Sequence, residues 1–168
     1  TIDVAKIESQ RDIAIHEFQE TFLVELGKNA GLARKKIVEA AFVRCQNPEI
    51  MDWQDHALLV TVIDDIRSRD GFLRKLHDEP ETRAQVQEHL AREIERAQEL
   101  HLGPLATVIA GIAWLGGDGE LASQMVDRAL QADATYSLAQ LLDIALRHNV
   151  PSYIWSQSLE AVSYEACI

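Results

Sequence analysis

The sequence predicts an all-α fold. Its 168 residues include only 8 glycines and 4 prolines, while alanine, leucine, glutamate and arginine, which favour helices, are abundant. Apolar side chains recur at helical spacing, and no stretch alternates apolar and polar residues as a strand does. Residues 104–115 are apolar on nearly every side, which predicts a helix buried on nearly every side. We therefore expect a single domain of about eight helices in stacked antiparallel αα-hairpins around residues 104–115.

The N-terminal part of the chain predicts two helices, over residues 3–26 and 32–45. Gly27 tolerates a left-handed backbone and is expected to end the first helix. The second helix ends before Pro48, because the residue preceding a proline is driven out of the helical region. Basic residues form one edge of the second helix: Lys35, Lys36 and Arg44.

Two longer helices are predicted in the middle of the chain. The first, over 53–69, opens with a capping box in which Asp52 and Asp55 bond each other's backbone amides. Gly71 is expected to loosen the helical segment that follows. The second, over 81–100, has few apolar positions among many charges, so we expect it to lie on the surface.

The C-terminal part predicts the central helix and three more. Gly103 is interpreted as the end of one helix and Pro104 as the beginning of the next, because glycine often ends a helix and proline often opens one. Helices over 119–132 and 136–148 follow, the latter ended by Asn149. A last helix begins near residue 151.

Length and charge limit the class of protein. The chain is long enough for one domain with a real core, and we divide it into sub-lobes of about 1–77 and 78–168. Residues 1–77 hold 13 acidic and 11 basic residues (net −2), and residues 78–168 hold 14 acidic residues and 5 arginines (net −9), which gives −11 overall. We therefore expect no nucleic-acid partner, because binding phosphates requires clustered Lys and Arg.

The chain is expected to work in the cytoplasm. Cys45 and Cys167 are too few for a disulfide framework and are interpreted as free thiols. The longest apolar run, near 104–117, is too short to span a membrane, and no signal peptide opens the chain. Because the sequence begins at Thr1 without a methionine, we expect it to be a fragment of a longer protein.

No motif in the sequence predicts a cofactor or metal site. Residues 117–122 fit a relaxed dinucleotide-binding pattern, but a predicted helix precedes them where that motif requires a strand. We interpret them as a turn between helices. His16–Glu20 and His89–Glu93 are spaced as possible ligand pairs, yet neither has a third ligand in view, so we expect solvated side chains and neither metal nor cofactor.

Catalytic residues are not predicted either. The acidic group of Asp52, Asp55, Asp64 and Asp65 is explained by helix capping for the first two and by solvent exposure for the others. Cys45 has no recognisable base near it in sequence. No nucleophile-elbow or phosphate-loop motif is present.

Four residues remain as candidates for binding: Arg67, Arg69, Asp70 and Trp155. An Arg69–Asp70 pair can clamp a helix junction, or the pair can bind an anionic group with the help of Arg67. We favour the clamp. Trp114 ends the most apolar helix and is expected in the core, whereas Trp155 is expected to expose a face to a partner.

The helical hairpin over 104–132 resembles a tetratricopeptide hairpin. Its Ala122, Val126 and Ala129 match small and apolar positions of that family's second helix, but Ala106 and Ala113 stand where the first helix carries aromatic residues. The resemblance covers half a repeat. It implies αα-hairpin packing in the C-terminal half of the chain.

A more specific resemblance covers roughly residues 60–156. It rests on Arg69-Asp70, Trp114-Leu115, Gly117-Asp118-Gly119, Ala122, Asp133, Tyr136-Ser137-Leu138-Ala139, Leu141-Leu142, Pro151 and Trp155. This pattern resembles an actinobacterial family known as domain of unknown function 4192, except that Ala134 and Ser152 stand where prolines are expected. The resemblance implies a further N-terminal region in the parent protein, and it implies no chemistry.

From the sequence alone we therefore expect a non-catalytic helical module for protein interaction or scaffolding. It would bind a protein partner or associate with itself, with no nucleic acid and no membrane involved. Two alternatives stay open. The chain could be an accessory domain of an enzyme whose catalytic part lies in sequence N-terminal to it, or it could be a homodimerisation domain.

Overall fold

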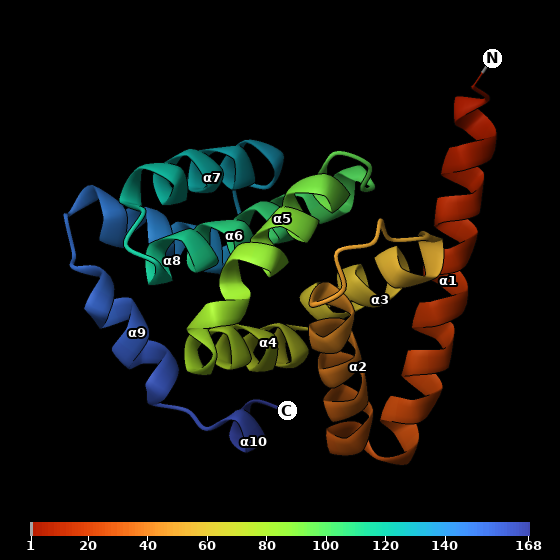
Figure 1. Cartoon of the computed structure of the whole chain (residues 1–168), viewed down its shortest axis with the longest axis horizontal. Coiled ribbons are helices and arrows are strands. Elements are labelled where there is room, and N and C mark those ends of the chain that lie inside the picture. The colour runs from red at the N-terminus through yellow and green to blue at the C-terminus, as the bar shows by residue number, and fades with distance from the viewer. Residues whose placement is uncertain (1) are drawn as a thin grey trace. The chain divides into compact units, whose positions relative to one another are not determined.

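The computed structural model describes residues 2–168, in which helices joined by short turns and loops are found and no strand is present (Figure 1). The all-α prediction is confirmed. The chain divides into two compact units, one reaching Phe72 and including Ile168, and the other spanning Leu73–Cys167. The single-domain interpretation stays a prediction, and the two units are described separately.

The first unit is built from α1 (Val4–Lys28), α2 (Ala30–Cys45) and α3 (Trp53–Asp64), which pack on one another. The predicted capping box forms at the start of α3, between Asp52 and Asp55. Helix α1 runs past Gly27, and Asn29 caps α2 by accepting a hydrogen bond from the amide of Leu32 at 3.1 Å. The buried apolar residues of α1 and α2 are Ala14, Ile15, Phe22, Ala33, Val38, Ala41, Phe42 and Cys45.

The single helix predicted over 53–69 is wrong, because the chain breaks at Asp65. This residue has an extended backbone (ψ 110°) after α3. Its carboxylate accepts hydrogen bonds from the amide and hydroxyl of Ser68, at 3.0 and 2.6 Å, and so begins α4 (Ile66–Asp78). Asp65 is therefore partly buried, contrary to expectation, while Asp64 is exposed as predicted. Gly71 does not loosen α4, which continues through it.

The second unit contains η1 (Pro80–Thr82), α5 (Arg83–Ile94), α6 (Glu99–Leu115), α7 (Gly119–Ala132), α8 (Ser137–Arg147), α9 (Ser152–Glu160) and α10 (Tyr164–Cys167). Helix α6 is buried at every residue from Gly103 to Trp114, which confirms the predicted central helix. Helices α5, α7, α8 and α9 all contact it. The unit is thus organised around α6 (Figure 1).

The predicted stop and start at Gly103 and Pro104 is wrong, because both residues lie inside α6. The helix break falls earlier, between Ile94 and Glu99, so the expected helix over 81–100 is divided there. Gly103 serves packing: a Cβ at this position would lie 3.3 Å from the Cβ of Asp133, at the end of α7. Glycine thus lets α7 approach the start of α6.

The turn between α6 and α7 agrees with the sequence. Gly117 has a positive φ of 81°, which glycine adopts without strain. Asp118 caps α7 by accepting a hydrogen bond from the amide of Leu121 at 3.0 Å. The residues 117–122 are therefore a turn between helices, as predicted. Asn149, also with a positive φ (53°), ends α8 as expected.

Trp155 attaches α9 to α6. Its indole N–H donates to the carbonyl of Gly111 at 2.9 Å, and its ring stacks on Trp114 with centroids 6.2 Å apart and planes 12° from parallel. The side chain is only 9% exposed, so the expectation that Trp155 offers a face to a partner is wrong. Gly111 makes room for it, because a Cβ there would lie 3.2 Å from Cζ2 of Trp155.

We expect Gly111→Ala to destabilise the protein by about 1–2 kcal/mol, although alanine favours helices, because stacking and the hydrogen bond prevent Trp155 from moving away. Urea unfolding measures this. Gly27→Ala is the matched control, since a Cβ there meets nothing within 4 Å, and it should stabilise by roughly 0.5–1 kcal/mol. Equal stabilisation by both substitutions would contradict the tight contact.

The carboxyl group of Asp65 should make the free energy of unfolding depend on pH in the acidic range. Burial alone would raise its pKa, but hydrogen bonds from Ser68 and Arg34 and the charge of Arg34 outweigh burial and lower the pKa. Its stabilisation is thus complete above the unfolded pKa of about 4 and is lost as the pH falls through the lowered folded value. Asp65→Asn should cost about 1–3 kcal/mol at pH 7.

Urea unfolding between pH 7 and pH 2 measures this dependence. The difference between the wild type and Asp65→Asn should shrink as the pH falls below about 4. A difference that stays constant across this range would show that the ionised carboxylate is not what matters.

Candidate functional site

The structure brings two of the four predicted binding residues into contact. Both Nε and Nη2 of Arg69 donate to Oδ1 of Asp70, at 3.0 and 2.9 Å. Arg69 is 7% exposed, whereas Arg67 lies on the exposed side of α4. The guanidinium of Arg69 is thus buried and paired with the next residue of the same helix, and its role as a clamp of a helix junction stays a prediction. Trp155 belongs to the second unit and packs in its core.

The expectation of solvated His–Glu pairs is right for one pair and wrong for the other. His16 and Glu20 are 71% and 66% exposed. His89 and Glu93 are each 2% exposed, and Glu93 accepts from Nε of Arg96 at 2.8 Å. His89 follows the buried Val86 by three residues, and Glu93 follows the buried Leu90 by three and precedes Ile94. This helical spacing could have predicted that both side chains are buried.

Metal-binding geometry is not found in residues 2–168, where no three His, Cys, Asp or Glu side chains gather closely enough to hold an ion. In the same residues no helix is long and apolar enough to cross a membrane. Cys45 is buried, Cys167 is partly buried, and neither forms a disulfide.

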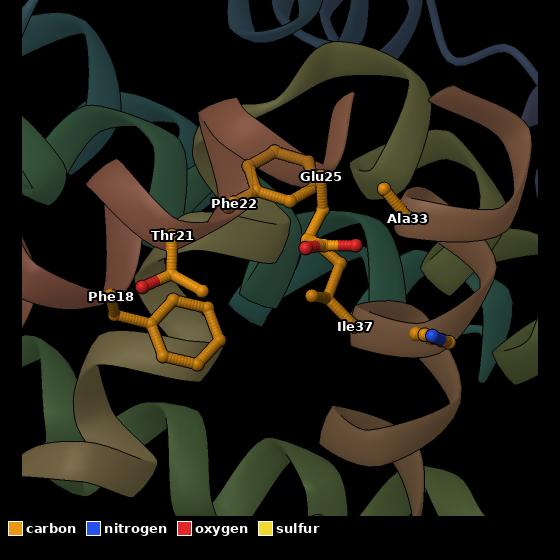
Figure 2. Close-up of a pocket in the computed structure, with 7 residues that line it drawn as sticks. Phe18, Thr21, Phe22, Glu25, Ala33 and Ile37 are labelled. Atoms are coloured by element: carbon orange, nitrogen blue, oxygen red, sulfur yellow. The ribbon is translucent and has the colours of Figure 1, made fainter. Parts of the chain in front are cut away.

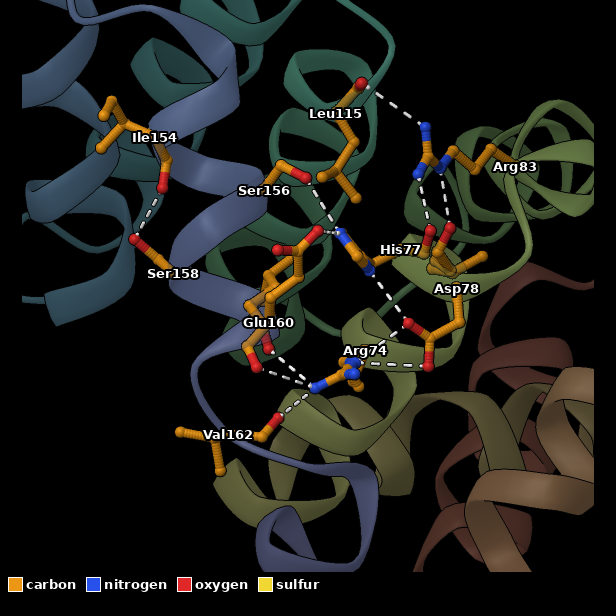
Figure 3. Close-up of polar contacts among 12 residues, drawn as sticks. Arg74, His77, Asp78, Arg83, Leu115, Ile154, Ser156, Ser158, Glu160 and Val162 are labelled. Atoms are coloured by element: carbon orange, nitrogen blue, oxygen red, sulfur yellow. Dashed lines mark hydrogen bonds and ion pairs between the residues drawn. The ribbon is translucent and has the colours of Figure 1, made fainter.

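A polar network that the sequence did not predict connects α4 and α9 (Figure 3). Nδ1 of His77 lies 3.0 Å from Oδ1 of Asp78, and Nε2 lies 2.9 Å from the hydroxyl of Ser156 and 3.1 Å from a carboxylate oxygen of Glu160. Arg74 donates from Nε to both carboxylate oxygens of Asp78, at 3.0 and 3.2 Å. From sequence, only the Arg74–Asp78 spacing could have indicated a contact.

His77 contacts a serine hydroxyl through one ring nitrogen and an aspartate through the other, as the histidine of a serine-hydrolase triad does. The surroundings of Ser156, however, do not suit catalysis. Nε2 of His77 is shared between the hydroxyl and the carboxylate of Glu160. Ser156 lies in the middle of α9, where backbone amides bond carbonyls four residues earlier and cannot form an oxyanion hole. The network is therefore better explained as a connection between helices.

Two arginines cap helices at this connection. Nη1 of Arg74 donates to the carbonyls of Leu159 at 3.2 Å, Glu160 at 3.4 Å and Val162, which satisfies the end of α9. Arg83 does the same for α4, with Nε 2.7 Å from the carbonyl of Leu76 and Nη2 3.0 Å from that of His77 (Figure 3). Their role is to hold helix ends.

The pKa of Asp78 reflects this network. Desolvation by burial would raise it, but hydrogen bonds from His77 and Arg74 outweigh that effect and lower it. Asp78 is therefore an ionised partner that keeps Arg74 in place.

An apolar groove between α1 and α2 is the best candidate for binding (Figure 2). Its volume is about 140 Å³, and its lining is mostly aromatic and aliphatic. The lining residues are Phe18, Thr21, Phe22, Glu25, Ala33, Lys36 and Ile37. Phe18 and Phe22 come from α1 and face Ile37 of α2 across the groove (Figure 2). We call this the α1–α2 groove.

Other grooves are less suited to binding. One of about 270 Å³ between α5 and α7 includes Glu95 and Arg128 in its lining, and these residues join in an ion pair of 2.9 Å. Another, of about 220 Å³ beside α1 and α3, includes Asp64 and Asp65. The lining of the α1–α2 groove is apolar in greater proportion than the lining of these grooves, and it includes two phenylalanines.

A protein-family model matches most of the chain. The family model of the Domain of unknown function (DUF4192) matches residues 10–152. The chain belongs to the DUF4192 family. No curated protein and no solved structure matches it.

The DUF4192 match extends the resemblance seen in the sequence toward the N-terminus. It includes the whole lining of the α1–α2 groove, from Phe18 to Ile37, and the α6–α7 hairpin. It ends at residue 152, where α9 begins. Ser156 and Glu160, which join α9 to α4, lie beyond the match.

We expect Arg74→Met to raise amide hydrogen-exchange rates in α9 and α10 by roughly tenfold or more, because about 1.5–3 kcal/mol is typical for hydrogen bonds from a charged group. Arg92→Met is the matched control, since Arg92 pairs only with Glu88 on its own exposed helix surface. Unchanged exchange in α9 would show that Arg74 does not hold it.

Proposed function

We propose that this chain is a non-catalytic helical interaction module that binds a segment of a partner protein in the α1–α2 groove. The observation that carries the proposal is the groove itself, in which Phe18, Phe22 and Ile37 leave an apolar cavity open to solvent. A groove between two antiparallel helices is a common receptor for an amphipathic segment, whose apolar side chains fill it.

Exposed apolar residues on the same helices support this proposal. Val24 of α1 is 57% exposed, and Leu32 and Val43 of α2 are 48% and 69% exposed. Single exposed apolar residues are ordinary, but several on the two helices that form an apolar groove favour an interaction surface. The explanation of the His77 network as a connection between helices also favours a binding role over a catalytic one.

The hairpins of the second unit support a tetratricopeptide-like scaffold. The start of α6, at Gly103, approaches the end of α7, at Ala129 and Asp133, so the two helices run antiparallel. Helix α8 packs next to α7 in turn. Stacked hairpins of this kind serve as scaffolds for protein binding. We further propose that the protein is cytoplasmic and actinobacterial, because its two cysteines form no disulfide and because its sequence carries the family pattern.

The proposal is tested by filling the groove. Thr21 is exposed and lines its mouth, so Thr21→Trp should block entry without removing any core side chain. We expect partner capture to fall roughly tenfold or more. The measurement is quantitative cross-linked pull-down with the full-length protein in its own cells, and circular dichroism checks the fold.

The matched control is Glu8→Trp, which adds the same bulk at an exposed position of α1 outside the groove. It should retain the partners that Thr21→Trp loses. Identical partner sets for the two variants would contradict binding in the α1–α2 groove.

A further inference from the structure

The α1–α2 groove contains one positive charge that the protein does not neutralise. Lys36 lines the groove and is exposed, and none of the carboxylates in residues 2–168 forms an ion pair with it. The two arginines of α2, by contrast, are paired. Nε of Arg34 lies 2.9 Å from Asp65, and Nε of Arg44 lies 2.8 Å from Asp55.

The carboxylate on the opposite wall does not compensate for this charge. Glu25 of α1 also lines the groove, but its Oε1 lies 3.4 Å from Nζ of Lys28 on the same helix. Glu25 is thus already paired, which leaves the ammonium group of Lys36 as the unneutralised charge of the lining. An unpaired ammonium group in the groove is notable in a chain with a net charge of −11.

The position of Lys36 is central to the apolar surface. Leu32 precedes it by four residues and Val43 follows it by seven, so the three share one face of α2. Of these three only Lys36 lines the groove, together with Ile37, the next residue of α2. A segment that inserts an apolar side chain into the groove therefore brings its neighbouring residues close to this ammonium group.

We infer that the α1–α2 groove binds a short partner segment in which an aspartate or glutamate flanks an apolar anchor residue. The apolar side chain contacts Phe18, Phe22 and Ile37, and the carboxylate pairs with Nζ of Lys36. This inference rests on the proposed function and adds the chemistry of the partner. An exposed ion pair of this kind contributes a twofold to fivefold preference, roughly, so it sets specificity more than affinity.

The test selects ligands from a displayed library of random 12-residue peptides, with the full chain as bait. We expect selected peptides to be enriched about twofold to fivefold in Asp or Glu beside an apolar anchor. With Lys36→Glu as bait, the enrichment should change to Lys or Arg. Lys35→Glu is the matched control, because Lys35 is exposed, equally charged and outside the groove lining, and it should select as the wild type does.

Binding of one selected peptide, measured by fluorescence polarisation, separates this inference from the proposed function. If Thr21→Trp abolishes binding but Lys36→Glu and the peptide's Glu→Gln form change nothing, groove binding stands and the acidic preference is overturned. If Thr21→Trp binds the peptide unchanged, or if no peptide is selected, both fail. Self-association that Lys36→Glu abolishes, seen by light scattering, would assign the groove to a second copy and overturn the inference.

Discussion

Helix α6 has no polar face, and the unit from Leu73 to Cys167 depends on that constraint. Every residue from Gly103 to Trp114 is buried, so other helices must cover the helix on all sides. Burial contributes about 0.8 kcal/mol per methylene group only where water is excluded. Close approach is therefore required, and Gly103 and Gly111 provide it toward α7 and α9. The glycines inside α6 are as much a part of the core as its large side chains.

Features fixed by local sequence could be predicted. The all-α class follows from composition and spacing, and the buried α6 follows from its own apolar residues. The capping box of Asp52 and Asp55 and the turn at residues 117–122 depend on neighbours a few positions away. In each case the residues that determine the structure lie within one or two helical turns of each other, so spacing alone was enough.

Features fixed by tertiary contact could not be predicted. Gly103 has the local pattern of a helix end, but it lies inside a helix, where the approach of α7 explains the need for a glycine. Asp65 looked solvent-facing because its partner Arg34 is 31 residues away. The basic edge containing Lys35 and Lys36 was visible in the sequence, but only the pairing of α1 with α2 distinguishes the lysine in the groove from the lysine outside it.

The contact between Gly111 and Trp155 has a consequence for how members of the family can diverge. The glycine lies inside the stretch that the DUF4192 model matches, and the tryptophan lies just beyond it. Because the two share one small volume, a bulkier residue at 111 costs stability unless a smaller residue stands at 155. Related chains should therefore carry correlated substitutions at these positions, and a member without the tryptophan loses the reason to keep the glycine. The presence of both the glycine and the tryptophan in a relative therefore indicates that a helix equivalent to α9 packs on α6.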